Sequence, residues 1–200
     1  MGVLKAARDL LRLLRALPAL AVVRRSPRRP AIERDVQRWV ECLRLGHEDE
    51  GFARRTAWLL AAFPEFRNLL QFRLGRWPGS LLRFFHRPVP TLQIDVADLG
   101  PGLFIQHGFA TIVVAERIGA DCWINQQVTL GHVYDRGAPV LGDRVTVAAG
   151  AVVVGPVVVG DDVTIGANTT VVRDVPAGTV VVSAAPRYLP AREVAVRPIG

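Results

Sequence analysis

The carboxy-terminal half of the chain carries a hexapeptide repeat, and this repeat constrains the fold more than any other feature. Aliphatic residues recur at a strict spacing of six: Leu141, Val147, Val153, Val159, Ile165 and Val171. Four residues after each lies a small or β-branched residue: Val145, Ala151, Val157, Val163, Thr169 and Val175. This period is typical of a solenoid in which each hexapeptide forms one strand and one turn, and three hexapeptides close a triangular coil. A β-sandwich would instead show alternation at a period of two.

The same pattern continues upstream with one interruption. The upstream aliphatic residues are Ile112, Ile118, Ile124 and Leu130, and we expect them to fill the axis of the coil. Leu99 and Ile105 keep the spacing between themselves but lie one residue out of register with Ile112. Leu130 and Leu141 are eleven residues apart instead of six. The extra residues, around 132–140, are therefore expected to leave the coil as a loop.

Glycine residues mark the expected corners of the coil. They directly follow aliphatic residues of the repeat: Gly119, Gly131, Gly142, Gly160 and Gly166. We expect the backbone to turn there in a space that a Cβ atom would crowd.

The charge is unevenly distributed along the chain. Residues 1–90 contain 18 Lys and Arg against 8 Asp and Glu, whereas residues 91–200 contain 7 against 10. The basic half is therefore a different module from the repeat. Its excess charge suits a solvated helical face or an anionic membrane surface. No base-reading motif or zinc-ligand spacing accompanies it, so we expect no nucleic-acid partner.

Apolar residues at helical spacing predict that the basic half is α-helical. Ile32, Val36, Val40 and Leu43 indicate one helix, and further helices are expected over 52–63, from Pro64 to about 74, and over 81–85. Residues 24–30 are expected to form a linker, and residues 75–80 a break. The predicted domains are a helical part (1–90), a coil (91–190) and a tail (191–200). A helical cap on the first coil would cover an edge that could otherwise pair with another chain.

The first helix has a leucine stripe beside several arginines. Leu4, Leu11, Leu14 and Leu17 share one helical face, which we expect to pack on the neighbouring helices. Contact of residues 1–30 with a membrane surface is the alternative. The uninterrupted apolar stretch 16–23 is too short to span a bilayer. The two cysteines, Cys42 and Cys122, form no disulfide framework, which favours a cytoplasmic protein.

Several sequence motifs match those of a known family. They are GPGLFIQHG, WINQQVTLGH, the block from Pro139 to Pro176, and PRYLP. The region from about Thr91 to Tyr188 resembles the left-handed parallel β-helix of the hexapeptide-repeat acyltransferases, most closely serine O-acetyltransferase and related enzymes of polysaccharide gene clusters. The resemblance implies a left-handed coil and a homotrimer with sites between subunits. It also implies acetyl-CoA as the co-substrate.

His107 is the candidate catalytic base. An imidazole titrating near neutrality is suited to remove a proton from a hydroxyl as that oxygen attacks a thioester. His107 lies where the coil register slips, so its side chain need not point into the apolar axis. In the family a carboxylate precedes this histidine, whereas this chain has Gln106. The change removes an acidic group from beside the acceptor.

A carboxylate on the other ring nitrogen would fix the tautomer of the base. The resemblance implies an Asp upstream of the histidine. Asp95 matches by its Ile-Asp word and is favoured, while Asp98 competes by position. Both could instead be solvated turn carboxylates.

The loop HVYDRGAP corresponds to a family loop whose Arg and His contact the acceptor. Arg136 matches that Arg, and a guanidinium suits carboxylate or phosphate groups. The family's loop His is absent. His132 lies earlier in the loop, at a place from which it would reach toward the acceptor.

The resemblance places coenzyme A along the later coils. Its pantetheine arm would lie on small residues, Ala148, Ala149 and Gly150 in one coil and Gly166 and Ala167 in the next. Arg173 and Arg187 are candidates for its phosphates. Plain coil packing would also explain the small residues.

Two other chemistries are disfavoured. Cys122 occupies a small corner position of the repeat, which favours direct transfer over a covalent acyl-enzyme. Carbonic anhydrases of this fold use three histidines, and this coil has only His107 and His132, so we expect no metal.

The sequence therefore predicts a helical cap followed by a left-handed parallel β-helix with O-acetyltransferase activity. The acceptor is L-serine or a serine-like molecule, or alternatively a hydroxyl of a sugar, a polysaccharide precursor or a secondary metabolite. A non-catalytic trimeric scaffold is the hypothesis from another class.

Overall fold

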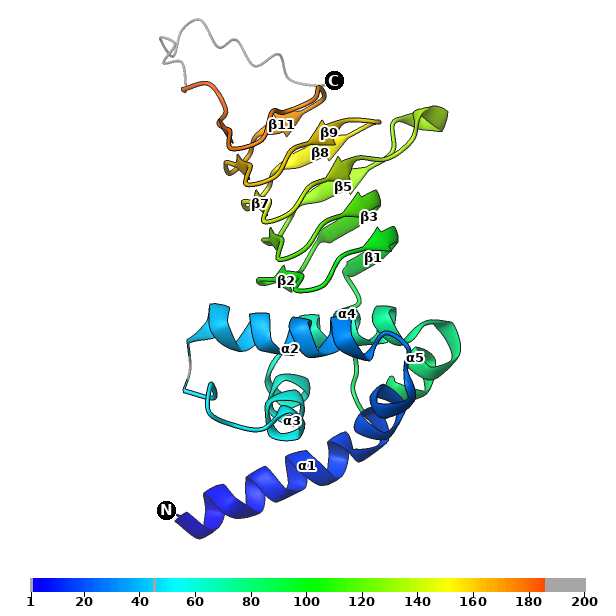
Figure 1. The fold of residues 1–200 in the computed structure, drawn as a ribbon, viewed down its shortest axis with the longest axis vertical. Helices are drawn as coiled ribbons and strands as arrows, with labels where there is room; N and C mark the ends of the chain where they lie inside the picture. Colours follow the sequence, from blue (N-terminus) through cyan, green and yellow to red (C-terminus); the bar gives the residue numbers. More distant parts are fainter. Residues whose placement is uncertain (1, 45, 186–200) are drawn as a thin grey trace, which may run out of the picture.

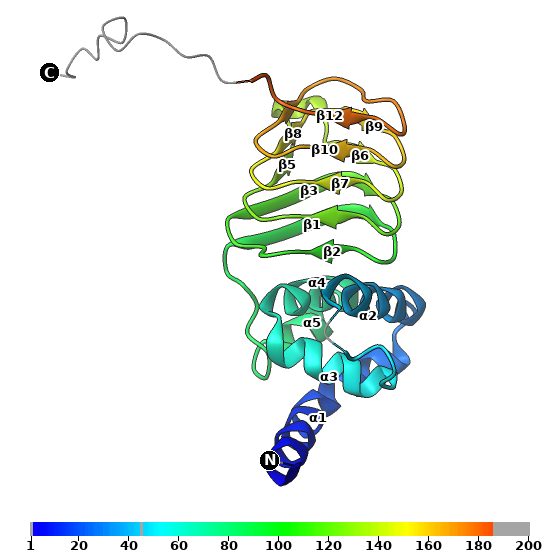
Figure 2. The same ribbon diagram turned by 90° about the vertical axis from the view of Figure 1, so that its left-hand side faces the viewer.

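Five helices precede the coil in the computed structural model, which describes residues 2–44 and 46–185 (Figure 1). They are α1 (Gly2–Arg25), α2 (Arg29–Leu43), α3 (Phe52–Ala62), α4 (Pro64–Leu74) and α5 (Arg76–Leu82). Prolines in the first turn of α2 and at the start of α4 suit positions where the backbone N–H has no helical partner. The helices stack against one end of the coil, and α1 lies farthest from it (Figures 1 and 2).

Short parallel strands build the rest of the described chain. They are β1 (Leu92–Leu99), β2 (Phe104–Ile105), β3 (Thr111–Ile118), β4 (Trp123–Ile124), β5 (Thr129–Gly131), β6 (Val140–Leu141), β7 (Thr146–Val147), β8 (Val152–Val154), β9 (Val158–Val159), β10 (Thr164–Ile165), β11 (Thr170–Val171) and β12 (Val180–Val181). A 3-10 turn (Tyr134–Arg136) interrupts the series between β5 and β6.

The strands form three faces of a prism (Figure 2). One face runs β1–β3–β5–β8–β11, and another runs β2–β4–β7–β10–β12. The long strand β3 turns a corner, because residues 112–113 pair with β5 whereas residues 117–118 pair with β6. The third face consists of the end of β3, β6 and β9, in that order. The structure is thus a parallel β-helix, as the period of six predicts.

The aliphatic repeat fills the axis. Ile105, Ile124, Val147 and Ile165 are paired in register from coil to coil, and all four are buried. The expectation for Ile112 is wrong, because Ile112 is 42% exposed while Val113 is fully buried and pairs with Leu130. The buried residues Val113 and Ile118 are five residues apart instead of six, because β3 continues through the corner between them, and the inward position therefore moves by one residue.

Glycines close one corner of the coil. A Cβ atom on Gly119 would lie 2.5 Å from the backbone of Gly142, and one on Gly142 would lie 2.9 Å from that of Gly160. A Cβ on Gly160 would lie 2.5 Å from Ala177 N. The expected crowding is therefore present at these three positions. Gly131 is different, since its nearest atom would be 3.9 Å away.

A buried ion pair joins the helices to the open edge of the first coil. Arg73 on α4 donates to both carboxylate oxygens of Asp35 on α2, at 2.8 and 3.0 Å. Arg73 also donates to the carbonyl oxygens of Leu99 and Gly100, and Asp35 accepts from the N–H groups of residues 102 and 103. Burial raises the pKa of the Asp35 carboxyl, opposed by Arg73 and these N–H donors. The pair thus satisfies edge groups that would otherwise be open to another strand.

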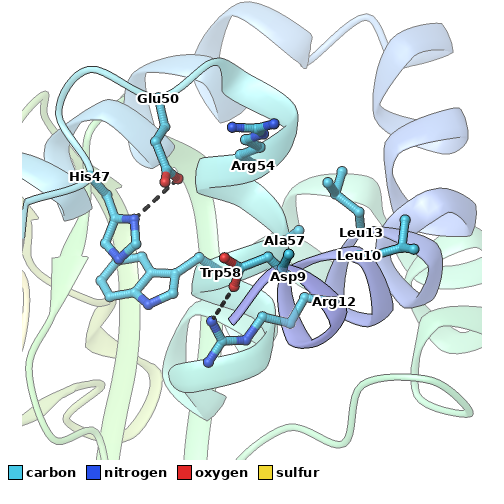
Figure 3. A pocket seen from close by; sticks show the side chains of 10 residues that line it. Asp9, Leu10, Arg12, Leu13, His47, Glu50, Arg54, Ala57 and Trp58 are labelled. Carbon is cyan, nitrogen blue, oxygen red and sulfur yellow. Dashed lines mark hydrogen bonds and ion pairs between the residues drawn. The ribbon is translucent and has the colours of Figure 1, made fainter. Parts of the chain in front are cut away.

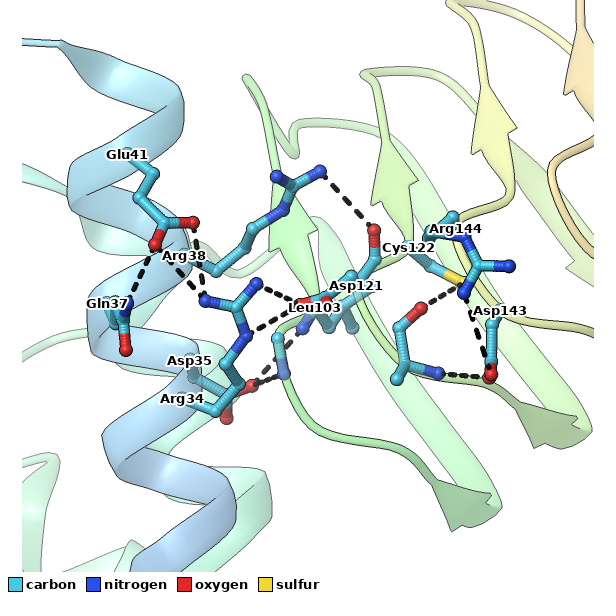
Figure 4. Close-up of polar contacts among 12 residues, drawn as sticks. Arg34, Asp35, Gln37, Arg38, Glu41, Leu103, Asp121, Cys122, Asp143 and Arg144 are labelled. Carbon is cyan, nitrogen blue, oxygen red and sulfur yellow. Dashed lines mark hydrogen bonds and ion pairs between the residues drawn. The ribbon is translucent and has the colours of Figure 1, made fainter.

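Further contacts from α2 fix the same junction (Figure 4). Arg34 binds the Asp121 carboxylate at 2.8 Å, and Arg38 donates to the carbonyl oxygen of Asp121. The buried Trp39 ring donates its N–H to the Leu103 carbonyl oxygen at 2.9 Å. The helices therefore act as the expected cap on the coil.

Two expectations for the helical part are wrong. Residues 76–80 belong to α5 instead of a break, because Pro78 lies in the first helical turn and Gly79 lets α5 approach α4. A Cβ on Gly79 would be 2.5 Å from Gln71 O. The linker is also shorter than expected, since only residues 26–28 separate α1 from α2.

The leucine stripe of α1 does not pack on its neighbours. Among the α1 side chains that the structure describes, Ala16, Ala19 and Val23 are the buried ones, whereas the leucines of the stripe are exposed. No helix in the described ranges is long and apolar enough to cross a bilayer. The domain limits stay a prediction, and the tail 191–200 lies outside the described residues.

Candidate active site

His107 lies at a corner of the first coil, between β2 and β3. The hydrogen bonds between coils align Gln106 with Asn125 and Phe109 with Gln126. His107 and Gly108 are therefore two extra residues relative to the next coil. The His107 backbone is left-handed, with φ of 53°, and its side chain is exposed. The imidazole thus stands outside the apolar axis, as the register slip predicts.

The turn around His107 is held by its neighbours. Gly108 is buried, and a Cβ atom there would lie 2.9 Å from Leu92 Cδ2 and 3.0 Å from Ile105 Cγ2. Thr111 Oγ1 accepts the Gln127 N–H and donates to the Phe109 carbonyl oxygen, both at 3.0 Å. Because contacts fix this turn on both sides, the backbone that carries the imidazole is held rigidly.

The predicted small residues lie at the same corner in later coils. Gly150 N–H binds Gln126 O, and Asn168 N–H binds Ala149 O. Ala148–Gly150 are half-buried, and Ala167 is exposed. We call Ala148–Gly150 with Gly166–Ala167 the small-residue edge. Strand spacing puts this edge within about 14 Å of Gln106 along the prism, so the structure brings the two predicted groups to one side.

The two candidate carboxylates lie on β1. Asp95 is exposed and pairs in register with Val114. Asp98 is also exposed and lies 3.5 Å from Arg117. In the described part of the chain, neither carboxylate is hydrogen-bonded to His107. The role of Asp95 in orienting His107, with Asp98 as the alternative, stays a prediction.

The excursion loop lies at a different corner. His132 and Arg136 are exposed between β5 and β6, and the loop projects away from the coil (Figure 1). Val133 packs toward the coil, 3.6 Å from a Cβ position on Gly155. One chain therefore does not bring Arg136 beside His107.

The remaining predicted residues are less constrained. Arg173 is exposed just after β11. Arg187 lies outside the described residues. Burial raises the pKa of the Cys122 thiol to about 11, and the thiol donates to the Gly142 carbonyl oxygen at 3.2 Å. A buried, protonated thiol is a poor nucleophile, so its place in the corner is a packing one.

The structure adds one residue that sequence reasoning missed. Glu65, in the first turn of α4, approaches the histidine turn, and its Cγ would lie 3.1 Å from a Cβ on Gly108. Among the described residues its carboxylate has no hydrogen-bond or ion-pair partner. The two positions are far apart in sequence, and no motif connects them, so only the docking of the cap reveals the contact.

A hollow of about 450 Å³ lies elsewhere, between α1 and α3 (Figure 3). Four of its polar side chains form two close pairs. His47 Nδ1 lies 3.1 Å from Glu50, and Arg12 lies 3.1 Å from Asp9. His47 also stacks on Trp58, with ring centroids 4.0 Å apart. Among the residues that the structure describes, none of the predicted site residues lines this hollow.

The chain matches the family model of the bacterial transferase hexapeptide (six repeats) over residues 138–173. It is similar to the serine acetyltransferase of Helicobacter pylori (strain J99), with 37% identity over 146 residues, which cover 66% of this chain and 85% of that protein. It is 33% identical over 125 residues to the serine acetyltransferase of Synechococcus elongatus, which covers 56% of this chain. The chain spans about half the length of that relative (51%).

A solved structure has the same architecture. The crystal structure of Neisseria gonorrhoeae serine acetyltransferase in complex with serine matches with a TM-score of 0.55 and 26% identity, over 78% of this chain and 66% of that one. The prediction of a helical cap followed by a left-handed parallel β-helix is confirmed by the strand topology and these matches.

Proposed function

The chain belongs to the serine acetyltransferase family, and from this premise we propose that it is an acetyl-CoA-dependent O-acetyltransferase. Its acceptor is the hydroxyl of L-serine or of a serine-like small molecule. One observation carries the proposal: an exposed imidazole, His107, stands at the head of the small-residue edge. The free thiols Cys42 and Cys122 agree with a cytoplasmic location.

His107 acts as the general base in a direct transfer. The imidazole takes the proton from the acceptor hydroxyl while that oxygen attacks the thioester carbonyl of acetyl-CoA. The tetrahedral intermediate collapses with cleavage of the carbon–sulfur bond. The imidazolium then returns its proton to the departing thiolate, so the products are the acetyl ester and free coenzyme A. The buried Cys122 supports a route without an acyl-enzyme.

Coenzyme A lies along the small-residue edge in this proposal. Side chains at Ala149, Gly150 and Ala167 are short enough for a flexible arm to approach the backbone. Arg173, and Arg187 beyond the described residues, would bind its phosphates. This arrangement directs the thioester toward His107.

Two charged side chains hold the acceptor in this proposal, Glu65 on one side and Arg136 on the other. Gln106 carries no charge where the family has a carboxylate. Glu65 offers a carboxylate beside the same turn that has no partner in the described ranges of the chain. An ammonium group, as in serine, would be its complement. Arg136 and His132 would contact the acceptor's carboxylate.

A homotrimer completes the site in this proposal. Arg136 and His107 lie at different corners of one chain, so a neighbouring copy must bring its loop to the histidine corner. Exposed aromatic residues at both places support this assembly: Phe109 follows His107 by two residues, and Tyr134 lies in the loop. Such side chains are typical of surfaces buried on association.

The test follows thiol release from acetyl-CoA, first with serine and then with sugars. Wild-type protein should release thiol with serine, and His107→Asn should lower kcat/KM by about 10²–10⁴-fold. Asn is chosen because it tolerates the left-handed backbone. Gln127→Asn, at the same corner with φ of 58°, is the matched control and should keep full activity.

Other outcomes identify the alternatives. Activity with a sugar and none with serine would assign the polysaccharide or secondary-metabolite acceptor, for which the uncharged Gln106 is the supporting feature. No thiol release with any acceptor, from either wild type or His107→Asn, would refute the enzyme and leave a trimeric scaffold.

A further inference from the structure

α1 exposes a row of leucines that nothing in the described chain covers. Leu4, Leu11, Leu14 and Leu17 are 79%, 66%, 54% and 52% exposed. The cap is held instead by the small residues Ala16, Ala19 and Val23 on the buried side of the helix. A contiguous apolar helix face of this kind marks an interaction surface, since isolated exposed leucines would not form a row.

Aromatic residues extend this apolar surface. Trp77 on α5 is 83% exposed and lines a shallow hollow of about 500 Å³ with Ala21, Val22 and Pro78. Phe84 is 86% exposed in the turn after α5, and the neighbouring Phe85 accepts two hydrogen bonds from Arg15 through its carbonyl oxygen. Trp77 therefore lies alongside α1, and Phe84 is the neighbour of a residue that Arg15 of α1 binds. We call the four leucines with Trp77 and Phe84 the leucine face.

Basic groups border the leucine face. Arg8, Arg15, Arg24 and Arg25 of α1 are all exposed. Asp9 is the one acidic residue of this helix, and it is paired with Arg12 at 3.1 Å. Two copies meeting through this face would bring like charges together, whereas an anionic surface would neutralise them. The charge thus distinguishes between occupants of the apolar face.

The place of α1 leaves this face accessible. α1 lies at the end of the molecule away from the coil, and the proposed active corners lie on the coil (Figures 1 and 2). Assembly through the coil corners would not cover the leucine face. A flat surface could therefore meet α1 along its length.

We propose that the leucine face binds an anionic membrane surface, with α1 lying in the plane of the interface. The leucines insert among the acyl chains, Trp77 and Phe84 sit at the boundary, and the arginines meet lipid phosphates. The inference is independent of the catalytic proposal, because it uses no residue of the coil.

Vesicle sedimentation of the full chain tests it. Protein should sediment with vesicles of phosphatidylcholine and phosphatidylglycerol, and weakly with phosphatidylcholine alone. Leu11→Gln/Leu14→Gln should lower the partition coefficient by about tenfold or more, because the inserted apolar area is lost. Arg8→Gln should lower it by about fivefold, the contribution of one basic residue at an anionic surface.

The control is Val172→Gln/Val182→Gln, two exposed apolar residues of the coil, which should change nothing. Circular dichroism should show that every variant keeps its helices. The proposal is overturned if wild type fails to sediment with anionic vesicles. It is also overturned if the leucine variant sediments like wild type but has a smaller mass by light scattering, because the face would then join two copies.

Discussion

Polar side chains have opposite environments at two places, the end of the coil that the helical cap covers (the closed end) and the corner that carries His107. At the closed end, Asp35 and Arg73 are buried and bind each other and four backbone groups. At the corner, His107 and the nearby Glu65 have no side-chain partner among the described residues. Buried charges must be satisfied inside the chain, whereas groups that act on a ligand must stay available. The difference indicates that the first cluster stabilises the fold, whereas the second stays available for the chemistry proposed above.

The largest effect is expected when the buried ion pair at the closed end is disrupted. Asp35→Asn leaves the Arg73 charge buried without its counterion and should lower the free energy of unfolding by about 3–5 kcal/mol. Urea unfolding followed by circular dichroism measures it. Asp162→Asn removes the exposed partner of Arg144 and should leave the midpoint unchanged. Equal effects of the two substitutions would refute the role given to the buried pair.

Crowding of the glycine corner comes next. Gly142→Ala places a Cβ atom 2.9 Å from the Gly160 backbone, so the coil must shift, at a cost of about 1–3 kcal/mol. Gly131→Ala has open space and should be close to neutral. The thermal midpoints of the two variants give the comparison. If both variants melt with the wild type, the corner does not need glycine.

A smaller effect sharpens the role of the open corner. Glu65→Gln should raise KM for serine by about tenfold, the loss of one charge-assisted contact to an ammonium group, without a change in the unfolding midpoint. Glu33→Gln, on the exposed side of α2, is the control. An unchanged KM in the Glu65 variant would remove this carboxylate from the acceptor site.

The smallest expected effect is a pH dependence of the cap. His86 is buried, with Nε2 3.2 Å from the Arg15 carbonyl oxygen, and burial lowers the pKa of its imidazole. The unfolded chain therefore binds the proton more tightly, and stability should fall as the pH drops below about 6.5. Urea midpoints one pH unit above and below that value measure it. His86→Gln should show a weaker dependence than wild type.

The coil could be predicted from sequence because its geometry repeats. Each aliphatic residue at the period of six meets the same neighbours, and the buried Val147 and Ile165 follow from that rule. The prediction failed at Ile112, because the continuous strand β3 places the buried Val113 and Ile118 five residues apart instead of six. Ile112 and Val113 are both aliphatic, so composition could not reveal the shift.

The cap and the site depended on contacts that sequence does not encode locally. Asp35 and Arg73 meet across two helices, and Glu65 reaches Gly108 only because α4 docks on the first coil. Pro78 and Gly79 indicated a break, yet both fit a helix that packs closely on α4. His107 and the small-residue edge lie on the same side of the coil, and their roles stay predictions.

Complementation between two inactive variants tests most directly that the open corner is completed by a second chain. His107→Asn and Arg136→Ala chains are unfolded, mixed and refolded together, and thiol release from acetyl-CoA is measured with serine. The mixture should regain activity that neither variant has alone, because some sites then combine an intact His107 with an intact Arg136 from a neighbouring copy. Mixed assemblies that remain as inactive as the separate variants would contradict this account.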